Sequence, residues 1–81
     1  MEKTSKTINL SIKLGELIRK YRLKLKISQE TLAEKADIHR TYVSDIELGK
    51  VDISITVAYR LAKALNISLS RLTKEAEENL S

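Results

Sequence analysis

Apart from Tyr42, residues 40–45 carry four polar side chains that could form hydrogen bonds to another molecule. They are Arg40, Thr41, Ser44 and Asp45. An arginine can donate two hydrogen bonds to O6 and N7 of guanine, and a serine or threonine hydroxyl can bond a base edge or a phosphate. Asp45 would repel phosphates, so it either accepts a hydrogen bond from cytosine N4 or pairs with a basic neighbour. The segment is therefore a candidate reader of DNA bases, with Arg40 as its main donor.

A helix over about residues 40–48 would place these four side chains on one exposed face. At about 100° per residue, Val43 and Ile46 point to the opposite side and would be buried. A second short helix is expected over residues 28–36, and a tight turn over residues 37–39 joins the two. Two short helices joined in this way form a helix-turn-helix, whose second helix can enter the major groove.

The composition predicts an all-α protein with a single domain. The chain has 81 residues, no proline and two glycines. It is rich in Leu, Ile, Ala, Lys and Glu, which favour helices over strands. A chain of this length supports one compact unit with a limited core.

The residue types do not indicate a catalytic site or a metal site. The chain has no cysteine, and His39 is its only histidine, so the usual thiolate and imidazole ligand sets are absent. We interpret His39 as a cap or turn residue. No glycine-rich phosphate loop and no recognisable catalytic spacing occurs. We therefore expect no enzyme activity, no metal and no cofactor.

The chain also lacks the marks of a membrane or secreted protein. No apolar run approaches about 20 residues, so no segment is expected to span a membrane. The N-terminus has no continuous apolar stretch of the kind found in signal peptides. These features, with the lack of cysteine, lead us to expect a cytoplasmic protein.

Positive charge is concentrated in the first third of the chain. The net charge is +4, but residues 1–26 hold eight Lys or Arg against two Glu, whereas residues 27–50 hold three against five acidic residues. Such a basic segment is either a solvated helix face or a phosphate-binding surface. Its position beside the helix-turn-helix favours binding to a polyanion.

We expect a polar N-terminal arm over residues 1–9 and one domain over residues 10–81 with five helices. The expected helices cover about residues 10–25, 28–36 and 40–48, with a fourth beginning after Ser54 and a fifth after Ser68. Serine is a good residue for capping a helix N-terminus. The last helix is expected to mediate dimerisation.

Several groups of residues carry a resemblance to a known family. They are Ile18-Arg19 with Arg22, Ser28-Gln29-Glu30 with Leu32-Ala33, Tyr42-Val43-Ser44 with Ile46-Glu47 and Gly49, and Leu61-Ala62-Lys63-Ala64-Leu65. Over residues 10–70 the sequence resembles the Cro/C1-type (XRE) helix-turn-helix family, whose fold is a compact five-helix domain. Within it, residues 38–44 and 52–55 are most similar to controller proteins of type II restriction–modification systems.

The resemblance implies roles for four residues outside the base-reading set, and helix geometry leaves two roles open for a fifth, Tyr42. Gln29 corresponds to a residue that binds a backbone phosphate at the start of the second helix, where free N–H groups attract anions. Lys50 corresponds to a phosphate-contacting loop. Tyr42 lies at the edge of the buried face, so it either packs there or contacts a phosphate. Arg22 and Glu47 correspond to a structural pair that bridges the first helix to the end of the third.

The sequence departs from the family pattern at Lys26 and Asp37, where relatives often have a glycine at a turn. If these turns need positive φ, each substitution costs about 1 kcal/mol or less. Asn66 is expected to end the fourth helix in a left-handed conformation.

The function implied is a sequence-specific DNA-binding transcriptional regulator. We expect an autoregulatory controller of a restriction–modification operon, binding double-stranded operator DNA of near-palindromic sequence as a homodimer. The alternatives are a phage-type repressor and an antitoxin-like interaction protein with the same fold.

Two further surfaces are suggested, each with an ordinary alternative. Leu69, Leu72 and Ala76 form an apolar strip that could be the dimer interface or simply part of the core. Glu30 and Glu34 lie one helical turn apart and match positions that, in activating relatives, contact the promoter-recognition subunit of RNA polymerase. The alternative for these two is a solvated face in which Glu30 interacts with the helix dipole.

Overall fold

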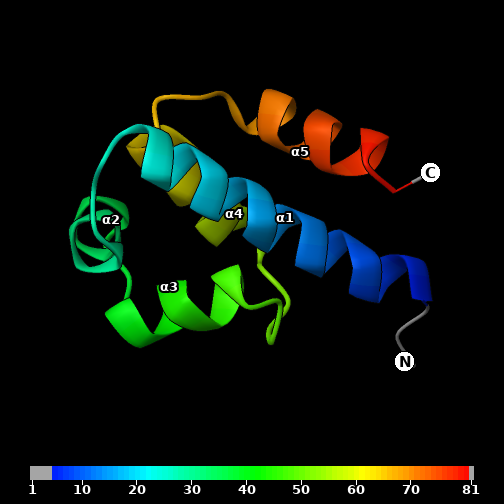
Figure 1. Ribbon diagram of the computed structural model, residues 1–81, viewed down its shortest axis with the longest axis horizontal. Helices are drawn as coiled ribbons and strands as arrows, with labels where there is room; N and C mark the ends of the chain where they lie inside the picture. Colours follow the sequence, from blue (N-terminus) through cyan, green and yellow to red (C-terminus); the bar gives the residue numbers. More distant parts are fainter. Residues whose placement is uncertain (1–4, 81) are drawn as a thin grey trace.

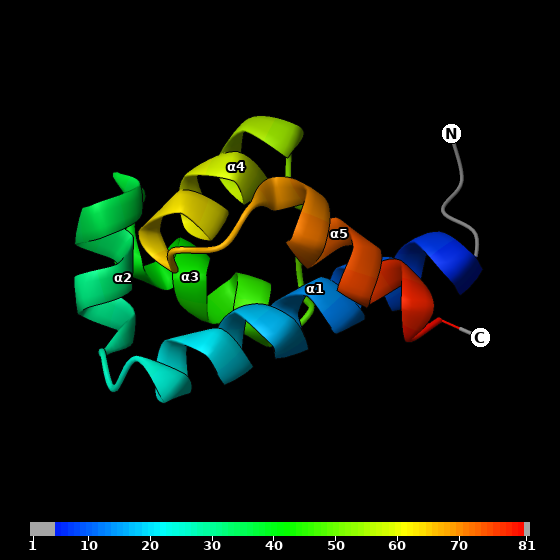
Figure 2. The same cartoon turned by 90° about the horizontal axis from the view of Figure 1, so that it is seen from above.

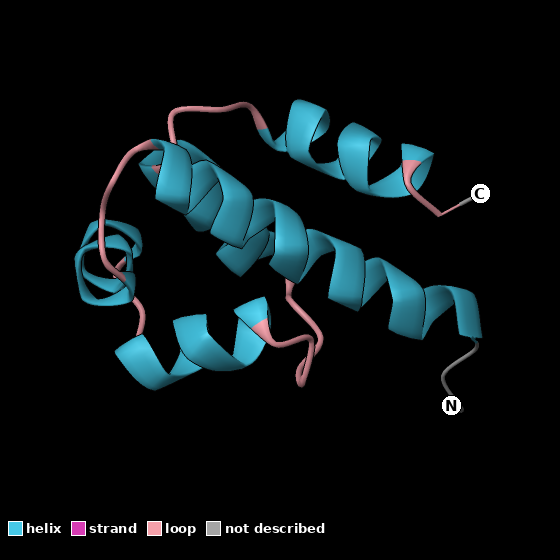
Figure 3. Ribbon diagram, viewed as in Figure 1, coloured by secondary structure: helices cyan, strands magenta, loops and turns pink. Residues whose placement is uncertain are grey.

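The structure is a computed structural model that describes the backbone of residues 5–80 and the side chains of residues 9–80. Within this range it contains helices and loops and no strand (Figure 3). The helices are α1 (Ser5–Lys24), α2 (Gln29–Ala36), α3 (Arg40–Glu47), α4 (Ile55–Ala64) and α5 (Leu69–Glu78). The expected all-α fold with five helices is confirmed.

The long helix α1 is the centre of the arrangement. It contacts α3 along one side and α5 along another, and these two helices lie on opposite sides of α1 in Figure 1. Helix α4 contacts α2 and α5, and Figure 2 shows it on the outside of the molecule above α3. The core lies between these helices, and its largest fully buried side chains are Ile18, Leu32, Val43, Ile46, Leu61 and Leu72.

The helix starts are set by local capping. Ser28, Ser54 and Ser68 each accept a hydrogen bond from a backbone N–H in the first turn of α2, α4 and α5. His39 does the same for α3, since its Nδ1 accepts from the N–H of Thr41 at 3.2 Å. These bonds satisfy donors that have no partner within the helix.

The first helix begins earlier than the sequence predicts. Helix α1 starts at Ser5, so residues 5–9, expected in a polar arm, are helical, while residues 1–4 lie outside the described residues. No glycine or proline interrupts the chain before Gly15. The polar residues of this segment can therefore continue the helical hydrogen bonding even though they do not extend the apolar stripe.

Three non-glycine residues adopt the left-handed conformation where helices end. Lys26 and Asp37 have φ of 56° and Asn66 has φ of 60°. The turns at Lys26 and Asp37 do require positive φ, so these departures from the family pattern introduce local strain of about 1 kcal/mol or less each. At Asp37 the backbone N–H donates to the carbonyls of Ala33 and Glu34, which closes the end of α2.

The apolar stripe of α5 faces the chain's own core. Leu72 and Ala76 have no exposed surface and belong to the core cluster, whereas Leu69 is only partly buried. The expectation that Leu72 and Ala76 form a dimer interface is therefore wrong, because side chains covered by their own domain cannot contact a second copy.

A hydrogen bond also holds α5 against α1. The Tyr21 hydroxyl donates to Glu75, and this hydrogen bond raises the pKa of Tyr21.

No helix of residues 5–80 combines the length and the apolar character that crossing a bilayer requires.

Candidate nucleic-acid interface

Helix α3 presents a polar face because its other face is fully used in packing. Val43 and Ile46 are completely buried and hold the helix against α1 and α2. Arg40 and Thr41, at the N-terminal end, are exposed, and Ser44 follows them one turn later, partly buried. The residues expected to read bases thus begin at the more accessible end of the helix.

A small pocket joins this face to the start of α2. It has a volume of about 160 Å³ and is lined by Gln29, Arg40, Thr41 and Ser44. The structure therefore brings the residue expected to bind a phosphate beside three of the residues expected to read bases. A DNA strand lying across this pocket would contact a phosphate-binding side chain and base-reading side chains of the protein at the same time.

A buried ion pair between Arg22 and Glu47 lies beneath this surface. Arg22 Nε donates to Glu47 Oε2 at 2.6 Å, and Arg22 Nη2 donates to Glu47 Oε1 at 3.0 Å. A third donor, Arg22 Nη1, bonds the carbonyl oxygen of Ile27 at 3.0 Å. The hydrogen bonds to Glu47 raise the pKa of Arg22 above its ordinary value. The expected structural pair is thus a bidentate salt bridge that links α1 to the end of α3.

Gln29 is attached to the same pair, which the sequence analysis did not foresee. Its Nε2 donates to Glu47 Oε1 at 3.0 Å. A glutamine amide has two N–H donors and a carbonyl oxygen, so one N–H remains for a phosphate. Glu47 therefore fixes the direction of a side chain that would otherwise rotate freely.

The remaining candidates on α3 and the following loop occupy different environments. Tyr42 is partly buried and packs against the core cluster, which favours the packing role. Asp45 is partly buried and forms no ion pair with the described side chains, so the alternative of a basic partner within the chain finds no support there. Lys50 is exposed, and its backbone N–H donates to the Asp45 carbonyl at 3.0 Å.

The acidic residues of α2 lie at the edge of this face. Glu30 and Glu34 are both exposed, and they line one depression together with His39 and Arg40. A protein bound beside DNA at this edge could therefore contact the two carboxylates while Arg40 remained on the bases.

Helix α4 exposes two large apolar side chains, Ile55 and Tyr59. Ile55 is 68% exposed and Tyr59 is 53% exposed. They are four positions apart, so they lie on one face of the helix. Apolar spacing predicts that Ile55 is buried together with Ala58 and Ala62. This prediction is wrong, because Ile55 is the first residue of α4 and is exposed.

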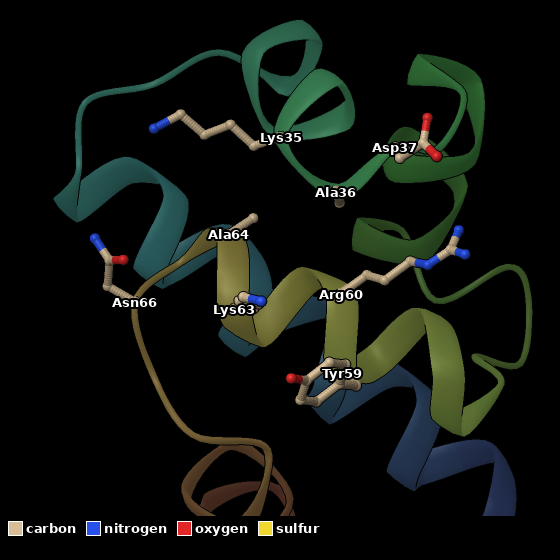
Figure 4. Close-up of a pocket in the computed structure, with 8 residues that line it drawn as sticks. All are labelled: Lys35, Ala36, Asp37, Tyr59, Arg60, Lys63, Ala64 and Asn66. Carbon is tan, nitrogen blue, oxygen red and sulfur yellow. The ribbon is translucent and has the colours of Figure 1, made fainter.

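A groove beside Tyr59 carries positive charge. It lies between the end of α2 and α4, has a volume of about 490 Å³ and includes Lys35, Arg60 and Lys63 in its lining. In Figure 4 the three cationic side chains point in different directions around a floor that contains Ala36. They do not converge on one point, so the groove is unsuited to gripping a compact anion.

Comparisons with known proteins agree with this geometry. A family model described as helix-turn-helix matches residues 18–72. The control protein C.BamHI of Bacillus amyloliquefaciens is 42% identical over 62 residues, which cover 75% of this chain and 76% of that protein.

Two solved structures are similar in fold as well. The restriction-modification controller protein C.AhdI from Aeromonas hydrophila is 35% identical, with a TM-score of 0.74 over 76% of this chain and 94% of that chain. The controller C.Esp1396I, solved as a tetramer in complex with its natural 35-base-pair operator, is 30% identical, with a TM-score of 0.78 over 88% of this chain and 93% of that chain.

Proposed function

The chain belongs to the helix-turn-helix family of the Cro/C1 (XRE) type, and we propose that it is a DNA-binding controller of a restriction–modification operon. The observation that carries the proposal is the grouping of Gln29 with Arg40, Thr41 and Ser44 around one pocket. The likeness to controllers that bind operator DNA supports the same conclusion. We propose that the protein acts in the cytoplasm and catalyses no reaction.

In this role α3 lies in the major groove with its N-terminal end toward the bases. Arg40 donates to guanine, Thr41 and Ser44 bond base edges or nearby phosphates, and Asp45 accepts from cytosine N4. Gln29 and Lys50 bind the phosphate backbone on either side of α3. Tyr42 stays in the packing at the edge of the core.

Substitution of Arg40 tests the proposal directly. We expect Arg40→Ala to weaken binding to the operator by about 1–3 kcal/mol and to relax the preference at one position in each half-site, because a guanine contact is lost. The operator is first selected from random DNA with the native protein, and affinities are then measured by fluorescence anisotropy.

Lys50→Ala is the matched control. It should weaken binding to all sequences and lower the slope of log affinity against log salt by about 1, since one phosphate-neutralising charge is removed. If Arg40→Ala kept the native site preference and changed only the salt slope, Arg40 would be a phosphate contact and the assignment of base reading would be wrong.

We further propose a homodimer that places two copies of α3 on a near-palindromic operator. With Leu72 and Ala76 buried, the exposed pair Ile55 and Tyr59 on α4 is the better candidate interface, and the partly buried Leu69 can contribute at its edge. Exposed apolar side chains of this size gain the most from being covered by a partner.

Glu30 and Glu34 are proposed as a contact to the promoter-recognition subunit of RNA polymerase. Their exposure beside Arg40 supports this role, because a polymerase subunit on the adjacent DNA could reach them.

Charge reversal at Glu34 separates this contact from DNA binding. We expect Glu34→Lys to keep or raise operator affinity, since it adds positive charge near DNA, while it abolishes activation in a reconstituted transcription assay. Lys35→Glu, which reverses the neighbouring charge outside the proposed contact, is the control and should leave activation intact at saturating protein. Full activation by an operator-bound Glu34→Lys protein would contradict the proposed contact.

A further inference from the structure

Helices α1 and α3 approach each other most closely at Gly15. A Cβ atom added there would lie 2.1 Å from the carbonyl oxygen of Ile46 and 3.2 Å from that of Glu47. Gly15 lies within α1 and does not have a positive φ, so the backbone conformation does not require glycine. Alanine is the better helix former at such a position. The need for glycine therefore comes from the contact between the two backbones.

The contact continues along α1 to the loop after α3. Ser11 Oγ donates to Asp52 Oδ1 at 2.8 Å. The side chain of Ile12 lies against Gly49, where an added Cβ would be 2.8 Å from Ile12 Cγ1. Residues 11, 12 and 15 of α1 thus form one seam with the end of α3 and the segment that follows it, which we call the α1–α3 seam.

The part of α3 held at this seam also carries a DNA contact of the proposed function. The Ile46 carbonyl accepts the N–H of Gly49 at 3.0 Å, and the next N–H, that of Lys50, donates to the Asp45 carbonyl at 3.0 Å. A group that pushed the Ile46 carbonyl away would disturb both bonds. It would move Lys50 and would tilt the short helix α3 as a unit, which shifts Arg40 at the other end of the helix.

We infer that Gly15 is a positioning residue for DNA recognition, which sets the depth and tilt of α3 by letting its C-terminal end rest directly on α1. This inference rests on the proposed function. Gly15 touches no DNA in this arrangement, and it acts through the placement of Arg40 and Lys50.

The test compares Gly15→Ala with a core variant distant from the seam. Leu65 is 2% exposed and lies at the end of α4, so Leu65→Ala should lower stability without moving α3. Operator and random-DNA affinities are measured for the native protein and both variants, under conditions where circular dichroism shows each to be folded. We expect the ratio of operator to random-DNA affinity to fall at least about tenfold in Gly15→Ala, and to stay within about twofold of native in Leu65→Ala.

A native ratio in folded Gly15→Ala, or an equal loss in Leu65→Ala, would overturn the inference. If Gly15→Ala does not fold, Ser11→Ala tests the same seam by removing the hydrogen bond to Asp52. A lowered operator preference in folded Ser11→Ala supports the inference, and an unchanged preference overturns it. A native protein that selects no sequence from random DNA would instead contradict the proposed function, which is a separate result.

Discussion

Glu47→Leu is expected to lower the free energy of unfolding by about 3–5 kcal/mol. Glu47 is almost fully buried beside Arg22, and it accepts hydrogen bonds from Arg22 and Gln29. Without the carboxylate, the Arg22 guanidinium would remain buried as an uncompensated charge. Urea unfolding followed by circular dichroism measures the loss.

The double variant Arg22→Met/Glu47→Leu shows whether the loss comes from the unpaired charge. Because it removes both charges, we expect it to recover most of the stability lost in Glu47→Leu. Lys13→Met is the matched control, since it breaks an exposed ion pair with Glu16 at 3.4 Å and should cost about 1 kcal/mol or less. A cost for Glu47→Leu no greater than that of the Lys13 control would contradict the proposed role of the buried pair.

Leu72→Ala is expected to lower the free energy of unfolding by about 2–5 kcal/mol, because it opens a cavity in the core. Leu72 is fully buried between α5 and the rest of the domain. Leu69→Ala serves as a control on the same helix and should cost less, since Leu69 is only partly buried. Both are measured by urea unfolding at a fixed protein concentration.

A charged substitution at Ile55 tests whether α4 forms the proposed dimer interface. Ile55 is 68% exposed in the single chain. We therefore expect Ile55→Glu to convert dimer to monomer in sedimentation equilibrium, with little loss of monomer stability, because the charge would have to be desolvated only in the interface. If Ile55→Glu remained dimeric, or if Leu72→Ala separated the copies without lowering monomer stability, α4 would not be the interface.

Features that depend on near neighbours in the chain follow from the amino-acid sequence alone. Apolar spacing predicted five helices, and the serines at 28, 54 and 68 cap three of them as expected. Helical periodicity and capping depend on residues a few positions apart, so they leave a local pattern that can be read directly. The motifs around Gln29 and Arg40 that contribute to the family resemblance are local in the same way.

The segment that covers each apolar face, by contrast, depends on how the helices pack together. The spacing of Leu72 and Ile55 is equally consistent with burial or exposure, and the packing of α5 across α1 and α4 buries the first while leaving the second open. The close contact at Gly15 and the hydrogen bond from Gln29 to Glu47 likewise join residues 31 and 18 positions apart. Such contacts depend on how distant helices meet, and a helical period specifies the direction of a side chain but not the neighbour that it finds there.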